Sequence, residues 1–193
     1  MAPETSRRPR ADAERNRLRI LDVARVLFAD RGGDVGLPEI ARAAGVGMGT
    51  VYRHFPSQRD LVEAAAQRRF AEILDFARGS CLRDSPPGRA IATYLRHVGE
   101  LLDSDRGLSA AIETARGSAG SEPRGDTRAE LESAVAALIE HDRAAGTLRA
   151  DCTVADVYLV VGALSATIRH GDGDWHRLLD LCLAGLGAHT PSA

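Results

Sequence analysis

The stretch LPEIARAAGVGMGTVYRHF, residues 37–55, constrains the fold more than any other part of the chain. Ile40, Ala41 and Ala44 recur at helical spacing, so its first half predicts a short helix with a small apolar face. Gly45 follows as a helix stop, and a second helix begins within a few residues. The segment therefore predicts two short helices joined by a tight turn, which is a helix-turn-helix.

The second of these helices is expected to turn Val51 and Phe55 inward and to leave a chemically mixed outer face. Such a face suits a DNA major groove, because arginine bonds guanine edges in pairs and a threonine methyl packs on a thymine methyl. Glycines remove side chains where the helix approaches the sugar-phosphate backbone. The candidate DNA contacts are Thr50 and Arg53 for bases, Met48 in the groove, Tyr52 and His54 for phosphate, and the amides near Gly47 and Gly49. Tyr52 has an equal alternative as a core residue.

The residues of this motif and its flanks are more specific than a general helix-turn-helix pattern. Ile40 and Ala41, the run Ala-Gly-Val at 44–46, the run Gly-Thr-Val-Tyr at 49–52, the pair His54-Phe55 and Leu61 together resemble the DNA-binding domain of the TetR family of bacterial transcriptional regulators. The resemblance spans roughly residues 15–70. It implies an all-α fold, with an N-terminal three-helix DNA-binding domain that carries the helix-turn-helix and a C-terminal helical domain for ligand binding and dimerisation. It also implies a homodimer that binds a palindromic double-stranded operator as a repressor and is released by a small-molecule effector.

Two positions depart from the family pattern. Gly36 stands where the family commonly has a phosphate-contacting threonine or serine, and Gln58 stands where it often has a lysine. We expect Arg59 to make the DNA contact that this lysine makes in the family. Arg15 and Arg19 are weaker candidates for phosphate contacts. These losses keep an alternative open, a helical protein-interaction adaptor whose helix-turn-helix is structural. The retained YRHF face favours DNA binding.

The charge of the chain is unevenly distributed, which also favours DNA binding. Residues 1–60 hold 11 arginines against 8 acidic residues, whereas the remainder holds 14 against 19, within a formal net charge of -2. The three cysteines, Cys81, Cys152 and Cys182, form no CxxC pair and indicate neither a disulfide framework nor a zinc site. No apolar run approaches membrane-spanning length, so no membrane partner is predicted and a cytoplasmic location is expected.

The chain is expected to have three parts: a mobile basic arm at 1–11, a DNA-binding domain at 12–56, and a ligand-binding and dimerisation domain at 57–193. The arm carries Arg7, Arg8 and Arg10, and Asp12 is a plausible N-cap for the first helix. Ser57 and Asp60 have the spacing of a capping pair that starts the helix joining the two domains. The segment GSCLRDSPPG, 79–88, is predicted as a linker.

Two segments near the end of the chain, 154–170 and 175–186, are apolar on more than one face and need covering on each. A two-fold partner provides this economically, because small residues let helices approach closely, and the family likewise pairs through its last two helices. A buried monomeric core is the alternative. The predicted dimer-interface residues are Gly162, Ala163, Ala166, Leu178, Leu179 and Cys182.

No residue pattern supports catalysis. Phosphate-binding loops, nucleophile elbows and HExxH pairs are absent from the sequence, so neither catalytic residues, a metal nor a cofactor is predicted. His170, Asp172, Asp174 and His176 are read as an ordinary polar turn between two helices. The family resemblance implies an effector pocket in the C-terminal domain, with the candidate lining residues Phe76, Tyr94, His97, Ile112, Thr114, Tyr158 and Thr167, each of which has plain core packing as its alternative.

Overall fold

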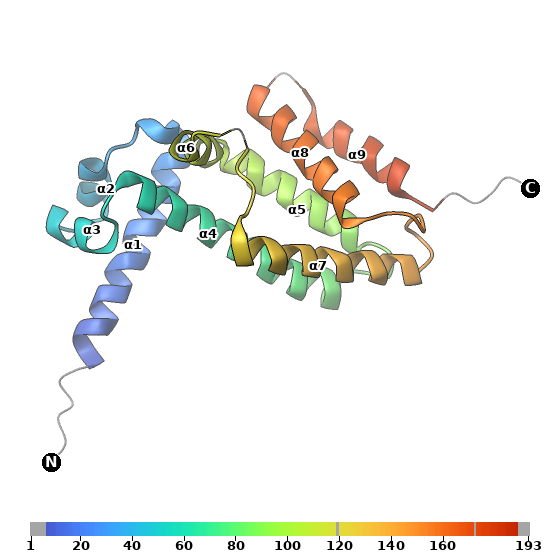
Figure 1. Cartoon of the computed structure of the whole chain (residues 1–193), viewed down its shortest axis with the longest axis horizontal. Coiled ribbons are helices and arrows are strands. Elements are labelled where there is room, and N and C mark those ends of the chain that lie inside the picture. The colour runs from blue at the N-terminus through green and yellow to red at the C-terminus, as the bar shows by residue number, and fades with distance from the viewer. Residues whose placement is uncertain (1–6, 119, 172, 189–193) are drawn as a thin grey trace, which may run out of the picture. The chain divides into compact units, whose positions relative to one another are not determined.

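The computed structural model describes residues 7–118, 120–171 and 173–188. These residues form nine α-helices, one 3-10 turn and one π-helix, with one isolated antiparallel bridge between Leu148 and Gly187 (Figure 1). The predicted all-α fold class is confirmed. Among the described residues, no helix is long and apolar enough to cross a membrane.

The chain divides into two compact units. The first contains the described residues up to Gln67 together with Asp105–Ser121, and the second contains Arg68–Ser104 and the described residues from Glu122 onward. Helix α4 (Gln58–Phe76) passes from the first unit into the second. The boundary expected after residue 56 divides the chain by function, and it stays a prediction.

The first unit holds the helix-turn-helix and one helix from much later in the sequence. Its core consists of apolar side chains that include Ile20, Phe28, Ile40, Val51 and Leu108, all fully buried. Since α6 packs on α1 and η2, residues predicted for the C-terminal domain lie in the same unit as the helix-turn-helix. The elements are α1 (Arg7–Arg31), the 3-10 turn η2 (Gly32–Asp34), α2 (Leu37–Ala43), α3 (Met48–His54), the start of α4, and α6 (Arg106–Arg116).

Two ion pairs and one glycine hold α6 in the first unit. Arg116 Nε donates to Glu63 Oε1 at 2.8 Å, and Arg25 Nη2 lies 2.9 Å from Asp105 Oδ2. A Cβ at Gly107 would overlap the carbonyl oxygen of Phe28 and would lie only 2.8 Å from that of Ala29. Glycine is therefore required where α6 crosses the end of α1.

The start of α1 differs from the prediction. The helix begins at Arg7, so Arg7, Arg8 and Arg10 lie in its first turn and Asp12 is not its N-cap. Alanine, arginine and glutamate favour helix, and Pro9 is tolerated because the first-turn amides have no intrahelical acceptor. The remainder of the predicted arm, residues 1–6, lies outside the described residues.

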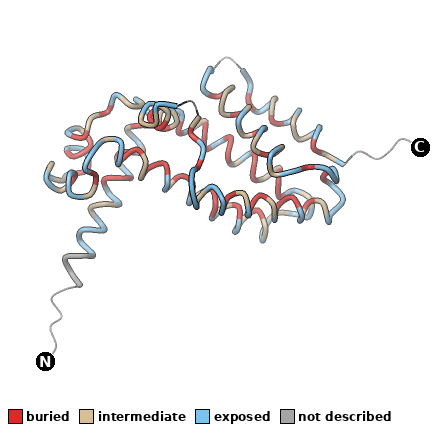
Figure 2. Tube along the Cα trace, in the orientation of Figure 1, coloured by how far each residue is buried: buried red, intermediate tan, exposed pale blue. Residues whose placement is uncertain are grey.

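The second unit is built around α5 (Ala90–Ser104), which contacts four other helical segments of this unit. Figure 2 shows buried positions along much of α5, and these include Ile91, Tyr94, Leu95 and Val98. Gly99 leaves room for the indole of Trp175, because a Cβ there would lie 2.9 Å from its Cε3. The surrounding segments are the π-helix η3 (Ala77–Asp84), α7 (Gly125–Ala144), α8 (Val154–His170) and α9 (Trp175–Leu186).

Carboxylates and hydroxyls fix the helix starts in this unit. Buried Asp142 accepts hydrogen bonds from the amides of Ala90 and Ile91 at 3.0 and 2.8 Å, which satisfies the N-terminus of α5 from another helix. Thr153 and Asp156 form a capping box at α8. Asp174 caps α9, so this part of the predicted polar turn has a structural role; Asp172 lies outside the described residues.

The predicted linker at 79–88 is wrong over its first six residues. Residues 77–84 continue directly from α4 as a π-helix, in which Ala77, Gly79 and Cys81 are buried. Packing against α5 and α7 outweighs the loop-like composition of this segment. Burial also raises the pKa of Cys81 to about 12, which leaves the thiol protonated and unreactive.

Candidate nucleic-acid interface

The turn of the helix-turn-helix is set by local backbone bonds. Gly45 adopts a φ of 65°, and the amide of Val46 returns to the carbonyl of Ala41 at 3.0 Å. This pairing ends α2 as predicted, because only glycine takes a left-handed conformation without a Cβ penalty. Gly47 is then the N-cap of α3, with extended backbone angles.

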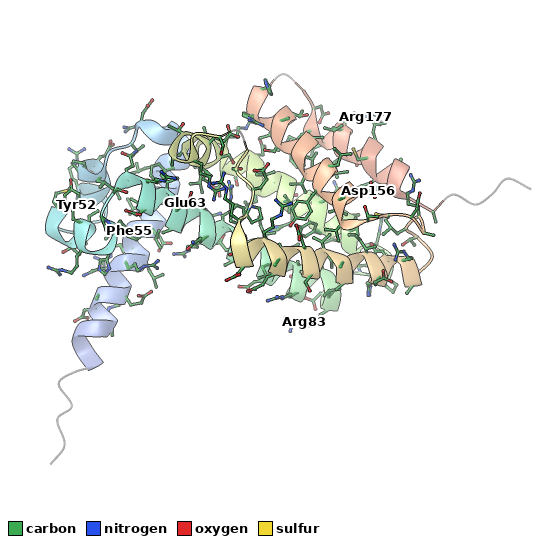
Figure 3. The ribbon with its side chains drawn as sticks, in the orientation of Figure 1. Tyr52, Phe55, Glu63, Arg83, Asp156 and Arg177 are labelled. Atoms are coloured by element: carbon green, nitrogen blue, oxygen red, sulfur yellow. The ribbon has the colours of Figure 1, made fainter. Side chains whose placement is uncertain are left out.

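The inward and outward faces of α3 separate as predicted. Val51 and Phe55 are buried in the first unit, and Tyr52, labelled with Phe55 in Figure 3, is 53% exposed. The alternative that Tyr52 belongs to the core is therefore wrong. Of the other candidates, Gly47, Gly49, Arg53 and Arg59 are exposed, and Met48, Thr50 and His54 are half-buried. All eight candidates are thus accessible on one unit, and their contact with DNA stays a prediction.

Gly47 and Gly49 have no packing reason to be glycine. Among the described residues, a Cβ built at either position would meet nothing within 4 Å. Glycine at Gly49, inside α3, costs helix stability relative to alanine. These residues therefore fit a surface that a nucleic-acid backbone approaches closely.

The start of α4 is fixed by the predicted capping pair. The amide of Asp60 donates to Ser57 Oγ at 3.2 Å, and the amide of Ser57 donates to Asp60 Oδ2 at 3.0 Å. Gln58 donates from Nε2 to the carbonyl of Gly33 at 2.9 Å, so its amide ties α4 to η2. Since that donor is used internally, exposed Arg59 is the better placed of the two for phosphate.

Contacts from α1 hold the helix-turn-helix in place. Arg31 forms a two-bond pair with Glu39 on α2, at 2.6 and 2.9 Å, and its side chain lowers the pKa of that carboxyl. The guanidinium of Arg17 lies 5.6 Å from the ring centre of Phe55. Fixed helices suit groove recognition, because base contacts need a defined orientation.

One basic residue of this region was missed by the sequence reasoning. Arg42 is exposed in the last turn of α2, where its charge helps to lower the pKa of Glu39. Its only sequence signal is a polar position inside the helix-turn-helix. We count it as an additional candidate for phosphate.

Comparison with known proteins agrees with this geometry. Residues 20–65 match the model of bacterial regulatory proteins of the tetR family, and residues 86–188 match the C-terminal domain of SbtR-like transcriptional regulators. A TetR transcription regulatory protein of Mycobacterium vanbaalenii is 34% identical, with a TM-score of 0.69 over 93% of this chain and 99% of that chain. The chain belongs to the TetR family of transcriptional regulators.

Two other matches either cover a shorter part of the chain or have a lower sequence identity. An HTH-type transcriptional regulator of Staphylococcus aureus is 43% identical over 60 residues, which is 31% of this chain and only 32% of that protein. The chain thus matches about a third of the length of this curated relative. RolR, solved in complex with its ligand resorcinol, shares the fold at 23% identity with a TM-score of 0.60, over 93% of this chain and 91% of that one.

The predicted effector-lining residues of this TetR-family chain fall in both units. Ile112 and Thr114 lie on α6 in the first unit, the former buried and the latter exposed. The others belong to the second unit, where Thr167 Oγ1 donates to the carbonyl of Ala163 at 3.0 Å and so has a partner in its own helix. The remaining four residues are Phe76, Tyr94, His97 and Tyr158.

These four residues include one aromatic stack and one unsatisfied hydroxyl. The rings of Phe76 and His97 stack with centres 3.7 Å apart. Burial raises the pKa of Tyr94, with smaller contributions from Tyr158 and Cys81, so these groups lie near one another. The hydroxyl of Tyr158 is buried and has no hydrogen-bond partner within the described part of the chain. A buried hydroxyl without a partner is unfavourable by ~1–3 kcal/mol, which favours a bound polar group there.

The environment of His97 predicts a pH-dependent stability. Burial lowers the pKa of His97 below its ordinary value of 6.5, while Glu100 and Glu72 partly oppose this effect. The unfolded chain therefore takes up the proton at higher pH than the folded chain, so this contribution is complete above about pH 6.5 and is lost as the pH falls. Urea unfolding at about pH 7.5 and about pH 5.5 is expected to show a smaller loss in His97→Gln than in the wild type.

A control for this measurement is His176→Gln, which removes an exposed imidazole from α9. It tests whether loss of any histidine gives the same result. Equal pH dependence in the wild type and in His97→Gln would contradict the assignment of the effect to His97.

The predicted dimer residues lie mainly on one face of α8 and α9. Gly162 is exposed, and Ala163, Ala166, Leu178 and Cys182 are half-buried. The prediction that Leu179 belongs to the dimer interface is wrong. Leu179 is fully buried within the protomer, because it shares the inner face of α9 with Trp175 and Leu186.

Two large apolar residues on these helices were not predicted. Leu159 is 74% exposed on α8 and Leu181 is 54% exposed on α9. Leu159 precedes Gly162 by three residues and Ala163 by four, so the helical repeat places it on the same face. This spacing could have predicted from the sequence that Leu159 is an interface candidate. We name Leu159, Gly162, Ala163, Ala166, Leu178, Leu181 and Cys182 the outer α8–α9 face.

Proposed function

We propose that this TetR-family regulator is a homodimeric repressor that binds a roughly palindromic operator through α2 and α3 and is released by a small-molecule effector. The single observation that carries DNA binding is the exposed face of α3 on a fixed helix-turn-helix. Arg53 and Tyr52 are exposed on this helix, and packing does not require glycine at Gly47 or Gly49. We expect the protein to act in the cytoplasm, where bacterial DNA is accessible.

Dimerisation is supported by the outer α8–α9 face. A Cβ at Gly162 would meet nothing within 4 Å in the part of the chain that the structure describes, so packing within that part does not explain a glycine in the middle of α8. Exposed Leu159 and Leu181 need covering, and a second copy provides the same surface in return. A dimer also matches the symmetry of two operator half-sites.

Effector binding is supported by the aromatic residues of the second unit. The buried hydroxyl of Tyr158 and the Phe76–His97 stack offer hydrogen bonding and ring packing to a small aromatic or polar molecule. The bound resorcinol of RolR shows that a protein of this fold holds such a molecule.

The first experiment is fluorescence anisotropy of the purified protein on DNA from upstream of its own gene, against scrambled DNA, at two salt concentrations. Tight, sequence-dependent binding that weakens steeply with salt is expected, because phosphate contacts release counterions. Equal and weak binding to both DNAs, followed by a genome-wide selection that recovers no specific fragment, would leave the protein-interaction adaptor as the remaining function.

The same assay tests Arg53 directly. Arg53→Ala is expected to weaken operator binding by ~1 to 3 kcal/mol, because it removes a side chain suited to paired bonds with a guanine edge. Arg83→Ala, at an exposed arginine in η3, is the matched control and is expected to bind as the wild type does. Unchanged operator affinity in Arg53→Ala, with the dimer intact, would remove Arg53 from the interface.

A further inference from the structure

A cavity of the second unit lies apart from the candidate effector residues. It has a volume of about 550 Å³, opens to solvent, and is lined by the segment before α5, the start of α5, the segment after α7 and the end of α9. None of the candidate effector residues lines it. Its volume is within the range of small-molecule sites.

The walls of this cavity are apolar and are held by backbone bonds. Ile91, Leu148, Leu183 and Leu186 supply aliphatic surface. The amide of Arg149 donates to the carbonyl of Leu186 at 3.0 Å, and the amide of Ala188 donates to that of Thr147 at 2.9 Å. These bonds join the end of α9 to the segment after α7, so the cavity is formed before any ligand arrives.

Two charged residues line the cavity, and they have different roles. Asp142 is buried, and each of its carboxylate oxygens accepts a backbone amide at the start of α5, which fixes its charge there. Arg89 is exposed, and its side chain makes no hydrogen bond or ion pair within the described residues. Arg89 therefore supplies the available charge among lining residues that are mostly apolar.

We propose that this cavity binds a small amphipathic monocarboxylate, with its aliphatic chain against Ile91, Leu148, Leu183 and Leu186 and its carboxylate on Arg89. A guanidinium recognises a carboxylate through two parallel hydrogen bonds, and burial of the chain supplies the affinity. Asp142 opposes a reversed orientation, because it would face the ligand carboxylate with a like charge. The proposal is independent of DNA binding and of the effector residues near Tyr94.

The test is isothermal titration calorimetry on the full-length protein with decanoate, decanol and decyltrimethylammonium. Decanoate is expected to bind at least about tenfold more tightly than either of the others, since they lack the negative charge. Arg89→Gln is expected to remove this preference, whereas Arg83→Gln, which changes an exposed arginine outside the cavity, is expected to keep it.

Ala92 also lines the cavity and allows a steric test. Ala92→Phe is expected to abolish decanoate binding by filling the space, and Ala92→Leu, a smaller change, to weaken it, with folding checked by thermal unfolding. Absence of decanoate binding to the wild type, equal binding of all three ligands, or a preference for decanoate that survives Arg89→Gln would overturn the proposal. Unchanged decanoate binding in a folded Ala92→Phe variant would overturn it as well.

Discussion

Replacement of both Leu159 and Leu181 by glutamate is expected to make the protein monomeric and to weaken operator binding by about 100-fold or more. Each leucine is more than half exposed on the protomer, so the substitutions leave its core intact. In the proposed dimer, each buried leucine contributes ~1.5–3 kcal/mol, and a glutamate buried there without a partner is strongly unfavourable. Operator affinity follows because a monomer binds one half-site and loses the effective concentration that links the two heads.

Light scattering after size exclusion measures the mass, and anisotropy on the operator measures the affinity. The matched control is Val26→Glu, which places the same charge at an apolar residue of α1 that is 68% exposed. It is expected to leave the dimer intact. A double variant that remains dimeric at micromolar concentration would exclude the outer α8–α9 face as the interface.

Gly107→Ala is expected to destabilise the protein by about 3 kcal/mol, because the new methyl overlaps backbone that cannot move aside. The groups it meets are the carbonyls of Phe28 and Ala29 and the amide of Gly32, so relief requires α6 to separate from α1. Such separation also strains the ion pairs of Arg25 with Asp105 and of Arg116 with Glu63.

Urea unfolding followed by circular dichroism measures this effect. Gly49→Ala is the control within the same unit, since a Cβ there meets nothing within 4 Å. It is expected to stabilise folding by up to ~1 kcal/mol through helix propensity, while it hinders close approach to DNA. If Gly107→Ala were as stable as the wild type, α6 would not be held against α1 as the structure describes.

The start of the chain and the segment after α4 show where sequence patterns were insufficient. The helix from Arg7 and the π-helix at 77–84 contain residues that suit more than one local structure. In the second segment, burial of Ala77, Gly79 and Cys81 against other helices decides in favour of helix. The composition of a segment indicates only the structure in which its residue types are found on average. Whether the segment forms a helix also depends on the elements that pack against it.

Short sequence patterns were enough to predict the helix-turn-helix, its turn at Gly45, the inward side chains of α3 and the capping pair of Ser57 and Asp60. These features depend on interactions between residues a few positions apart, so a short pattern contains all the groups involved.

Three features became visible only in the folded chain. Helix α6 belongs to the unit of the helix-turn-helix, Leu179 is buried while Leu159 and Leu181 are exposed, and Asp142 caps a helix that is distant in sequence. Each of these depends on partners distant in sequence. The residues next to a leucine or an aspartate in the sequence do not show whether it is buried or exposed. The neighbours that pack on it in the folded chain determine how much it contributes to the free energy of folding.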